Sequence, residues 1–298
     1  MIRKSRGYLM MAALLMIPGV MTLASPKNPG LGELLEQART DDYVMPDASD
    51  LLKAEDSFRH WLAADDRLAA AQYLGSPDQV GLGFKAVAVP RSDIVALTET
   101  DNERQGRGFF AARREGGAPL LIQAPHQYYD LRTGAIARKL FLEGNAMAAA
   151  WNTTHRYQGD DTDLVHIADS YLHALSRAFA DVHPGGRILQ LHGFSSAKRE
   201  SRAGREARAI LSDGSGFPPA SLARLADCLS QRLDIRALLY PRDVRELGAT
   251  TNTLAADLRR RGFDGFVHLE LDVGLRKRLV RDVDARNSLM QCVAETHL

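Results

Sequence analysis

Apolar residues recur along the chain with two different spacings, and each spacing predicts a different kind of element. Over residues 50–74 they follow one face of a helix, and Gly75-Ser76-Pro77 ends the pattern. Strand-like runs follow, separated by Pro90 and by Gly116-Gly117; they cover residues 84–89, 94–98, 108–112 and 119–123. We expect these runs to form a hairpin-rich part of a sheet.

Helical and strand-like segments alternate beyond residue 130. The predicted helices cover residues 131–142, 163–182, 219–233, 252–261 and 274–294, and the predicted strands cover residues 146–151, 187–192, 237–240 and 265–271. Asn252 has the position and chemistry of a helix N-cap, and we assign it no further role. The alternation predicts an α/β fold with a mainly parallel or mixed central sheet and helices on both faces, in a single domain over residues 49–298.

The first residues have the features of a secretory signal. Arg3, Lys4 and Arg6 precede an apolar stretch, and Thr22-Leu23-Ala24 offers small residues for cleavage. The stretch covers about 16 residues, which is short for a membrane-spanning helix of roughly 20 residues, although an uncleaved anchor is the alternative. We expect a signal peptide over residues 1–24, a flexible leader over residues 25–48, and a periplasmic or secreted protein with no stable membrane insertion after cleavage.

Composition argues against a nucleic acid partner and leaves the state of the two cysteines open. The whole chain carries a formal net charge of +1, and the expected cleavage removes three basic residues. No basic excess remains, so nucleic acid is a poor candidate partner. Hydrophobic residues make up 45% of the chain, enough for one large core. Cys228 and Cys292 could pair in an oxidising compartment, or each could be a small apolar core residue.

Metal-type ligands follow three of the predicted strands. His126 and Asp130 come after the first of them, His192 ends the second, and Glu270 lies in the last. Because α/β enzymes build sites at the carboxyl ends of strands, these side chains could converge. A hydrolytic zinc site needs about three ligands and a carboxylate base. We assign His126, Asp130 and His192 as zinc ligands and Glu270 as the catalytic base.

Each of these residues has a simpler interpretation. A single His beside a strand is more often a hydrogen-bonded packing residue, and no helical His-Glu-x-x-His motif is present. Glu270 shares one face of its strand with His268 and Asp272, and it could form a buried ion pair with Arg276 or Arg278. The metal interpretation depends on three strand ends offering suitable residues together.

A polar segment after the strand at 146–151 supplies candidate substrate contacts. Arg156 could bind a substrate carboxylate through two hydrogen bonds or polarise the scissile carbonyl, and Asn152 could assist. His155 could be a neighbour of the metal. The alternative for this segment is an ordinary surface loop.

The order of these motifs resembles the zinc-dependent carboxypeptidase and amidohydrolase superfamily, with N-formylglutamate amidohydrolases and poly-γ-glutamate hydrolases as nearer members. The resemblance covers roughly residues 120–276 and implies a phosphorylase/hydrolase-like sheet, one zinc ion, and hydrolysis of an amide beside a carboxylate. It also implies His126, Asp130 and His192 as ligands, Glu270 as base and Arg156 as a substrate contact. Carboxypeptidases usually have His-x-x-Glu, whereas this chain has His-x-x-x-Asp.

The expected function is therefore an exported zinc hydrolase that cleaves γ-glutamyl, acyl-amino acid or cell-wall peptide bonds. Its expected partner is a small peptide or acyl-amino acid substrate. A non-catalytic periplasmic binding protein on the same fold is the main alternative. A serine hydrolase is the other, because Leu191-His192-Gly193-Phe194 resembles an oxyanion loop, but no Gly-x-Ser-x-Gly elbow follows.

Overall fold

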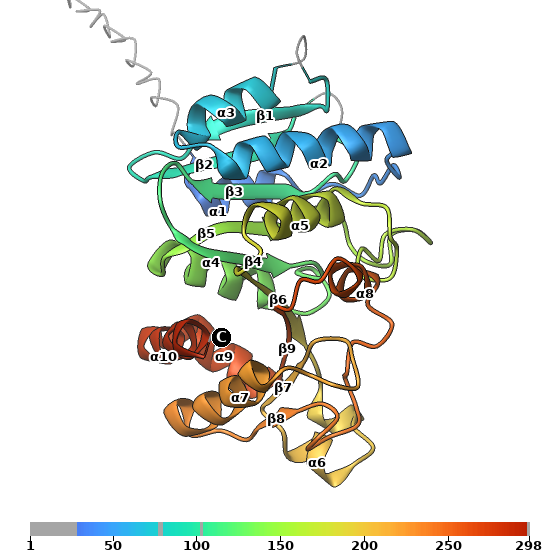
Figure 1. Cartoon of the computed structure of the whole chain (residues 1–298), viewed down its shortest axis with the longest axis vertical. Coiled ribbons are helices and arrows are strands. Elements are labelled where there is room, and N and C mark those ends of the chain that lie inside the picture. Colours follow the sequence, from blue (N-terminus) through green and yellow to red (C-terminus); the bar gives the residue numbers. More distant parts are fainter. Residues whose placement is uncertain (1–28, 77–79, 102–103, 297–298) are drawn as a thin grey trace, which may run out of the picture.

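The computed structural model describes residues 29–76, 80–101 and 104–296. Its strands form one mixed nine-stranded sheet, which confirms the predicted α/β class. The strands are β1 (Phe84–Ala88), β2 (Ile94–Glu99), β3 (Phe109–Arg113), β4 (Ala118–Ala124), β5 (Ala146–Trp151), β6 (Arg187–Gly193), β7 (Ala209–Ser212), β8 (Ala237–Leu239) and β9 (Phe266–Leu271). Their order across the sheet is β1-β2-β3-β5-β4-β6-β9-β7-β8, which Figure 1 shows from top to bottom.

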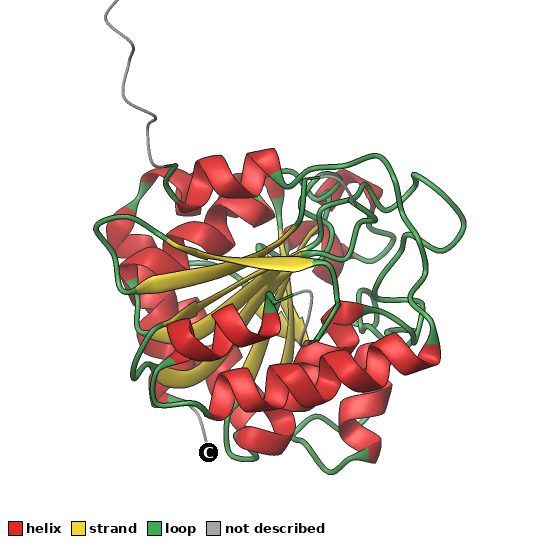
Figure 2. Ribbon diagram, turned by 90° about the horizontal axis from the view of Figure 1, so that it is seen from above, coloured by secondary structure: helices red, strands yellow, loops and turns green. Residues whose placement is uncertain are grey.

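Helices cover both faces of the sheet (Figure 2). They are α1 (Leu31–Gln37), α2 (Ala48–Ala63), α3 (Arg67–Leu74), α4 (Thr133–Glu143), α5 (Tyr171–Val182), the 3₁₀ turn η1 (Ser196–Lys198), α6 (Arg202–Glu206), α7 (Ala220–Leu233), α8 (Thr253–Arg260), α9 (Val273–Arg281) and α10 (Val283–Glu295). One buried apolar cluster joins α1, α4, α7, α9 and α10 to one face, and another joins α2, α3, α5 and α8 to the other. Neighbouring strand residues such as Ile188 and Leu189 enter opposite clusters, as the period of two requires.

Parallel pairing in the middle of the sheet brings the predicted strand ends together. β5, β4, β6 and β9 are parallel neighbours, and the register places His192 opposite Glu270. The hairpin-rich entry is also confirmed, since β1, β2 and β3 pair antiparallel. β7, which the apolar pattern did not predict, pairs antiparallel with β9 and parallel with β8. The carboxyl ends of β4, β6 and β9 therefore share one edge.

Several predicted helices have different bounds in the structure. The helix expected over residues 50–74 is α2 followed by α3, and Asp66 caps the second one by accepting from Leu68 N and Ala69 N. Asp282 divides the terminal helix into α9 and α10 in the same way. The helix expected from residue 163 begins only at Tyr171, with Ser170 as its N-cap. Carboxylates and hydroxyls favour caps because they satisfy the free N–H groups of a first turn.

Part of the segment expected to be a flexible leader is helical in the structure. The predicted signal peptide and the start of the predicted leader lie outside the described residues. Within the leader, however, α1 buries Leu31, Leu34 and Leu35 in the core against α4, so this part of the 25–48 segment is held by apolar burial. No helix in the described part of the chain is long and apolar enough to cross a bilayer.

The two cysteines, whose state the sequence left open, form a disulfide. Cys228 on α7 is bonded to Cys292 on α10 across 64 residues of sequence. The bond therefore ties the terminal helix to the same face of the sheet.

Candidate metal centre

The candidate ligands gather at the carboxyl edge of the parallel strands. His126 follows β4, and the turn after it is closed by Asp130 N donating to His126 O at 2.7 Å. His192 lies near the end of β6. The atoms His126 Nδ1 and His192 Nδ1 are 3.6 Å and 3.1 Å from Asp130 Oδ2. One ligand atom from each of the three residues lies within 4.8 Å of the others, and all three residues are buried.

The charge states of this cluster suit a cation. Burial raises the pKa of Asp130, but interactions with the neighbouring imidazoles of His126 and His192 outweigh burial and hold that pKa below its usual range. Burial lowers the pKa of His192 to about 4 and brings that of His268 well below its ordinary value. Neutral imidazoles and an ionised carboxylate are the protonation states that metal ligation requires.

Asp163 joins the site although the sequence analysis placed it in a helix. It accepts a hydrogen bond from His126 Nε2 at 2.9 Å and another from Arg156 Nη2. The donation uses the Nε2 proton of His126 and leaves its Nδ1 lone pair facing Asp130. The run from Gly159 to Thr162, just before Asp163, is rich in turn-forming residues. It could have indicated that the helix begins later than residue 163.

Glu270 is buried beside the cluster with part of its carboxylate unpaired. It is 8% exposed, and its Oε2 finds no hydrogen-bond partner among the described residues. Burial, followed by the charge of Asp130, raises the pKa of Glu270 to about 8. The ion pair considered as an alternative does not form within the described chain: Arg276 donates to the carbonyls of Leu131 and Phe194, and Arg278 donates to Asp282 and to a carbonyl.

A second potential ligand set overlaps the first. Ligand atoms of His192, His268 and Glu270 also lie within 4.8 Å of one another. The rings of His192 and His268 are 4.5 Å apart, and His268 Nδ1 is 3.3 Å from Ser212 Oγ. Ser212 is fully buried in β7, so this row of Ser, His and Glu lacks an accessible nucleophile. The two sets share His192.

The segment after β5 lies against the candidate ligands. Asn152 is buried, its Oδ1 accepts from Thr154 N at 3.1 Å, and its Nδ2 has no partner within the described ranges. Arg156 Nη1 lies 2.9 Å from His126 Nδ1. Its guanidinium lies over the rings of Tyr129 and Tyr157, at 5.4 Å and 5.1 Å. Arg156 therefore connects the buried ligands to two exposed aromatic rings.

His155, considered as a metal neighbour, belongs to this aromatic group instead. Its ring lies 6.0 Å from that of Tyr129 and 5.9 Å from that of Tyr157, and its Nδ1 accepts from Tyr157 N. It contributes to neither ligand set found among the described residues.

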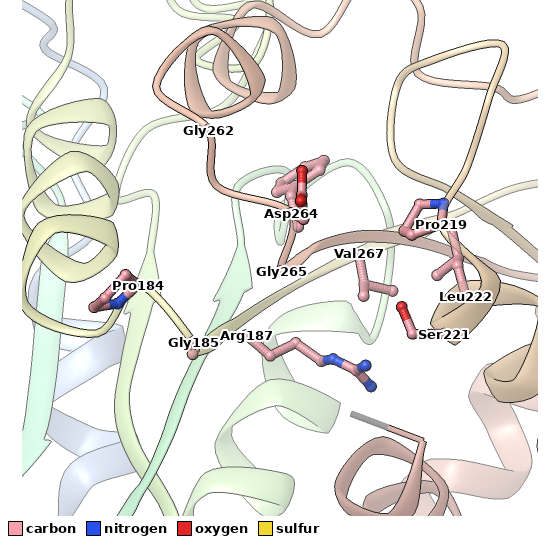
Figure 3. A pocket seen from close by; sticks show the side chains of 12 residues that line it. Pro184, Gly185, Arg187, Pro219, Ser221, Leu222, Gly262, Asp264, Gly265 and Val267 are labelled. Carbon is pink, nitrogen blue, oxygen red and sulfur yellow. The ribbon is translucent and has the colours of Figure 1, made fainter. Parts of the chain in front are cut away.

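The opposite edge of the sheet offers less chemistry. A small cavity of about 120 Å³ lies where β6 and β9 begin, and Figure 3 shows Arg187, Ser221 and Asp264 around it. Its described lining has Asp264 as its one carboxylate and no histidine. The histidine and carboxylate cluster at the carboxyl edge is therefore the candidate site.

Comparisons with known proteins assign no family to this chain. No model of a protein family matches the chain, and no curated protein matches it. Among solved structures, N-formylglutamate amidohydrolase from Ralstonia eutropha is 12% identical with a TM-score of 0.43, covering 64% of this chain and 98% of its own. Succinylglutamate desuccinylase from Vibrio parahaemolyticus is 14% identical with a TM-score of 0.44, covering 71% and 78%. An aspartoacylase family protein from Mesorhizobium loti is 14% identical with a TM-score of 0.39, covering 71% of each chain.

Identities and TM-scores of this size carry no assignment of chemistry, which therefore depends on the residues of the site.

Proposed function

We propose that the protein is an exported zinc-dependent hydrolase that cleaves an amide or peptide bond next to a carboxylate. The observation that carries this proposal is the convergence of His126, Asp130 and His192 within 4.8 Å, beside the unpaired buried oxygen of Glu270. Small peptides and acyl-amino acids are the proposed substrates, including γ-glutamyl and cell-wall material.

The donor set fits zinc. Two imidazole nitrogens and one carboxylate oxygen are the ligand types that catalytic zinc sites use, with a further position left for water or substrate. His126 would bind through Nδ1, since its Nε2 donates to Asp163. Carboxylates that orient ligating imidazoles in this way are a common feature of zinc sites.

In the proposed reaction the metal would activate the water and the carbonyl, and Glu270 would transfer the proton. A zinc ion held here would acidify a water molecule and polarise the scissile carbonyl. Glu270 would take the proton of the attacking water through its unpaired Oε2 and return it to the leaving nitrogen. Its pKa of about 8 belongs to the metal-free chain, and a nearby divalent cation favours the ionised form that a base needs.

Arg156 and Asn152 would recognise the substrate. The guanidinium can form two parallel hydrogen bonds with a carboxylate, and the unpaired Nδ2 of Asn152 can donate a further one. Arg156 Nη1 now contacts His126 Nδ1, so metal binding at that nitrogen would free Nη1 for a substrate carboxylate, beside the exposed rings of Tyr129 and Tyr157. Binding of the metal and of the substrate carboxylate would then be linked.

Two features support export. The Cys228–Cys292 disulfide is of the kind that persists in oxidising compartments. The basic and apolar start of the sequence has the pattern of a signal peptide. We accordingly propose a periplasmic or secreted location, with no stable membrane insertion after cleavage and no nucleic acid partner.

The test combines metal analysis with the Glu270→Gln variant. We expect purified wild-type protein to bind one zinc ion per chain and to hydrolyse acyl-amino acids or γ-glutamyl peptides. Glu270→Gln should retain zinc and lose roughly 10² to 10⁴ in rate, the usual contribution of a general base. Glu200→Gln, at an exposed position, is the control.

Full activity in Glu270→Gln would remove this residue from the mechanism. The non-catalytic alternative makes the opposite predictions: no stoichiometric zinc in the wild type, and unchanged partner binding by His126→Ala.

A further inference from the structure

A buried chain of amides runs from His192 into the core on the α5 and α8 side. Gln190 Oε1 lies 3.0 Å from His192 Nε2 and accepts from Asn252 Nδ2 at 2.8 Å. Gln190 Nε2 donates to Gln123 Oε1 at 3.0 Å. Gln123 Nε2 in turn donates to Ser176 Oγ at 2.7 Å. The four residues that continue this chain from His192 are all buried, so water cannot substitute for their hydrogen bonds.

Backbone groups at the two ends determine which way every amide points. At one end the N–H of Ala255, which can only donate, binds Asn252 Oδ1 at 3.0 Å and so turns Asn252 Nδ2 toward Gln190. At the other end the carbonyl of Leu172, which can only accept, binds the Ser176 hydroxyl at 2.6 Å and leaves Ser176 Oγ to accept from Gln123. With both ends fixed, Gln190 must present its oxygen to His192.

This orientation determines where His192 carries its proton. An oxygen acceptor at Nε2 requires an N–H there. In the neutral ring, the form that metal ligation requires, the lone pair then lies on Nδ1, 3.1 Å from Asp130 Oδ2. Two lone-pair atoms at this separation are stabilised by a cation between them. His126 has the same arrangement, because Asp163 takes its Nε2 proton and its Nδ1 also faces Asp130.

We propose that Gln190, oriented by Asn252 and Gln123, is a positioning residue that holds His192 with its proton on Nε2 and so keeps Nδ1 as the nitrogen that can bind a metal together with His126 and Asp130. The binding of a metal depends on the proposed function, whereas the position of the proton does not.

Nuclear magnetic resonance of ¹⁵N-histidine-labelled protein tests the proton position directly. In metal-free wild type we expect Nε2 of His192 to be protonated, with the signal assigned through His192→Asn. After addition of ¹¹³Cd²⁺ as a spectroscopic probe for the metal, we expect coupling to Nδ1 of His192. An unprotonated Nε2 in the metal-free protein would overturn the proposal. Protonated Nε2 without any metal binding would instead contradict the proposed function alone.

Asn252→Asp should invert the chain of amides. Its carboxylate still caps α8 by accepting from Ala255 N, but it has no donor for Gln190. We expect Gln190 to turn its amide nitrogen toward residue 252 and His192. Gln123 would turn with it, and the Ser176 hydroxyl would then donate to Gln123 Oε1 in place of the Leu172 carbonyl. This change moves the His192 proton to Nδ1 and blocks that nitrogen for the metal. Zinc affinity, measured by competition with a chelator, should fall by about 10- to 100-fold, as for other residues that orient metal ligands.

Asn252→Ser is the matched control, because serine also caps helices but is too short to reach Gln190. It should keep the Nε2 proton and near wild-type zinc affinity. Gln190→Met supplies a second variant should Asn252→Asp fold poorly: it removes the acceptor and should populate the Nδ1–H form. An unchanged His192 spectrum and unchanged zinc affinity in either Asn252→Asp or Gln190→Met would refute the positioning role.

Discussion

Asp163 accepts a hydrogen bond from Nε2 of His126 at 2.9 Å, although 37 residues separate the two in the sequence. The same carboxylate binds Arg156, and hydrogen bonds with His126 and His166 outweigh burial in holding its pKa below the usual range. Asp163 therefore stays ionised at neutral pH and keeps the His126 proton away from Nδ1. The geometry of one candidate metal ligand therefore depends on a loop that contributes no candidate ligand itself.

Removal of this acceptor should weaken the metal site. We expect Asp163→Ala to lower zinc affinity by about 10- to 100-fold, because the His126 ring loses the partner that fixes its orientation and proton. Asp163→Asn should have a smaller effect, since the amide oxygen can still accept. Chelator competition measures both, and Asp160→Ala, exposed in the same loop, should bind zinc as the wild type does. Equal affinities throughout would mean that Asp163 does not orient His126.

Removal of the Arg156 side chain should strengthen zinc binding and weaken substrate binding. Its Nη1 competes for the Nδ1 lone pair of His126, and its charge repels a cation. Arg156→Ala should therefore bind zinc more tightly than the wild type in calorimetric titration. The same variant should show a higher KM for substrates with a free carboxylate, because their anchor is lost. Weaker zinc binding would contradict this account, and Lys198→Ala, exposed in η1, controls for the loss of one positive charge.

Acid should destabilise the protein through His173, away from the metal centre. Burial lowers its pKa to about 3, while its ring bonds Ser170 and Thr253. Below the ordinary histidine pKa the unfolded chain binds a proton that the folded chain excludes. The contribution of His173 to the free energy of unfolding is therefore fully present above about pH 6.5. It is lost as the pH falls toward 3, by at most about 1.4 kcal/mol per pH unit.

The measurement is urea unfolding of the wild type and of His173→Gln at pH values from 7 to 4. We expect the variant to lose stability less steeply than the wild type over this range. Some acid sensitivity should remain, because burial lowers the pKa of His192 as well. Parallel profiles for the two proteins would show that His173 titrates in the same way folded and unfolded.

The disulfide should contribute measurably to stability. Closing a loop with a sequence separation of 64 restricts the unfolded chain, which by the chain-entropy model corresponds to about 4 kcal/mol. We expect the double variant Cys228→Ala/Cys292→Ala to melt about 10 °C lower than the oxidised wild type. Reduction of the wild type, which leaves the side chains in place, should produce a similar shift. No shift on reduction would indicate that the bond does not constrain the chain.

Local sequence patterns were sufficient for most of the sheet. The strands that carry His126, His192 and Glu270 are apolar runs, and alternation with helices indicated that they are parallel. Parallel strands end at a common edge, so the approach of these side chains could be predicted without coordinates. β7 was not predicted because four buried residues between polar segments are too few to show the alternation typical of a strand. α1 was not predicted because its few apolar residues lie in a segment rich in Gly, Pro and charge.

The amino-acid pattern alone thus specified the α/β class, every strand except β7, and the residue types gathered at the strand ends. Tertiary structure alone decided which nitrogen of each histidine faces Asp130. For His126 the choice depends on its hydrogen bond to Asp163, 37 residues away. For His192 it depends on Gln190 in the same strand, which is oriented by a hydrogen bond from Asn252, 62 residues away. Such bonds depend on distance in space, and neither propensity nor periodicity along the chain carries information about them.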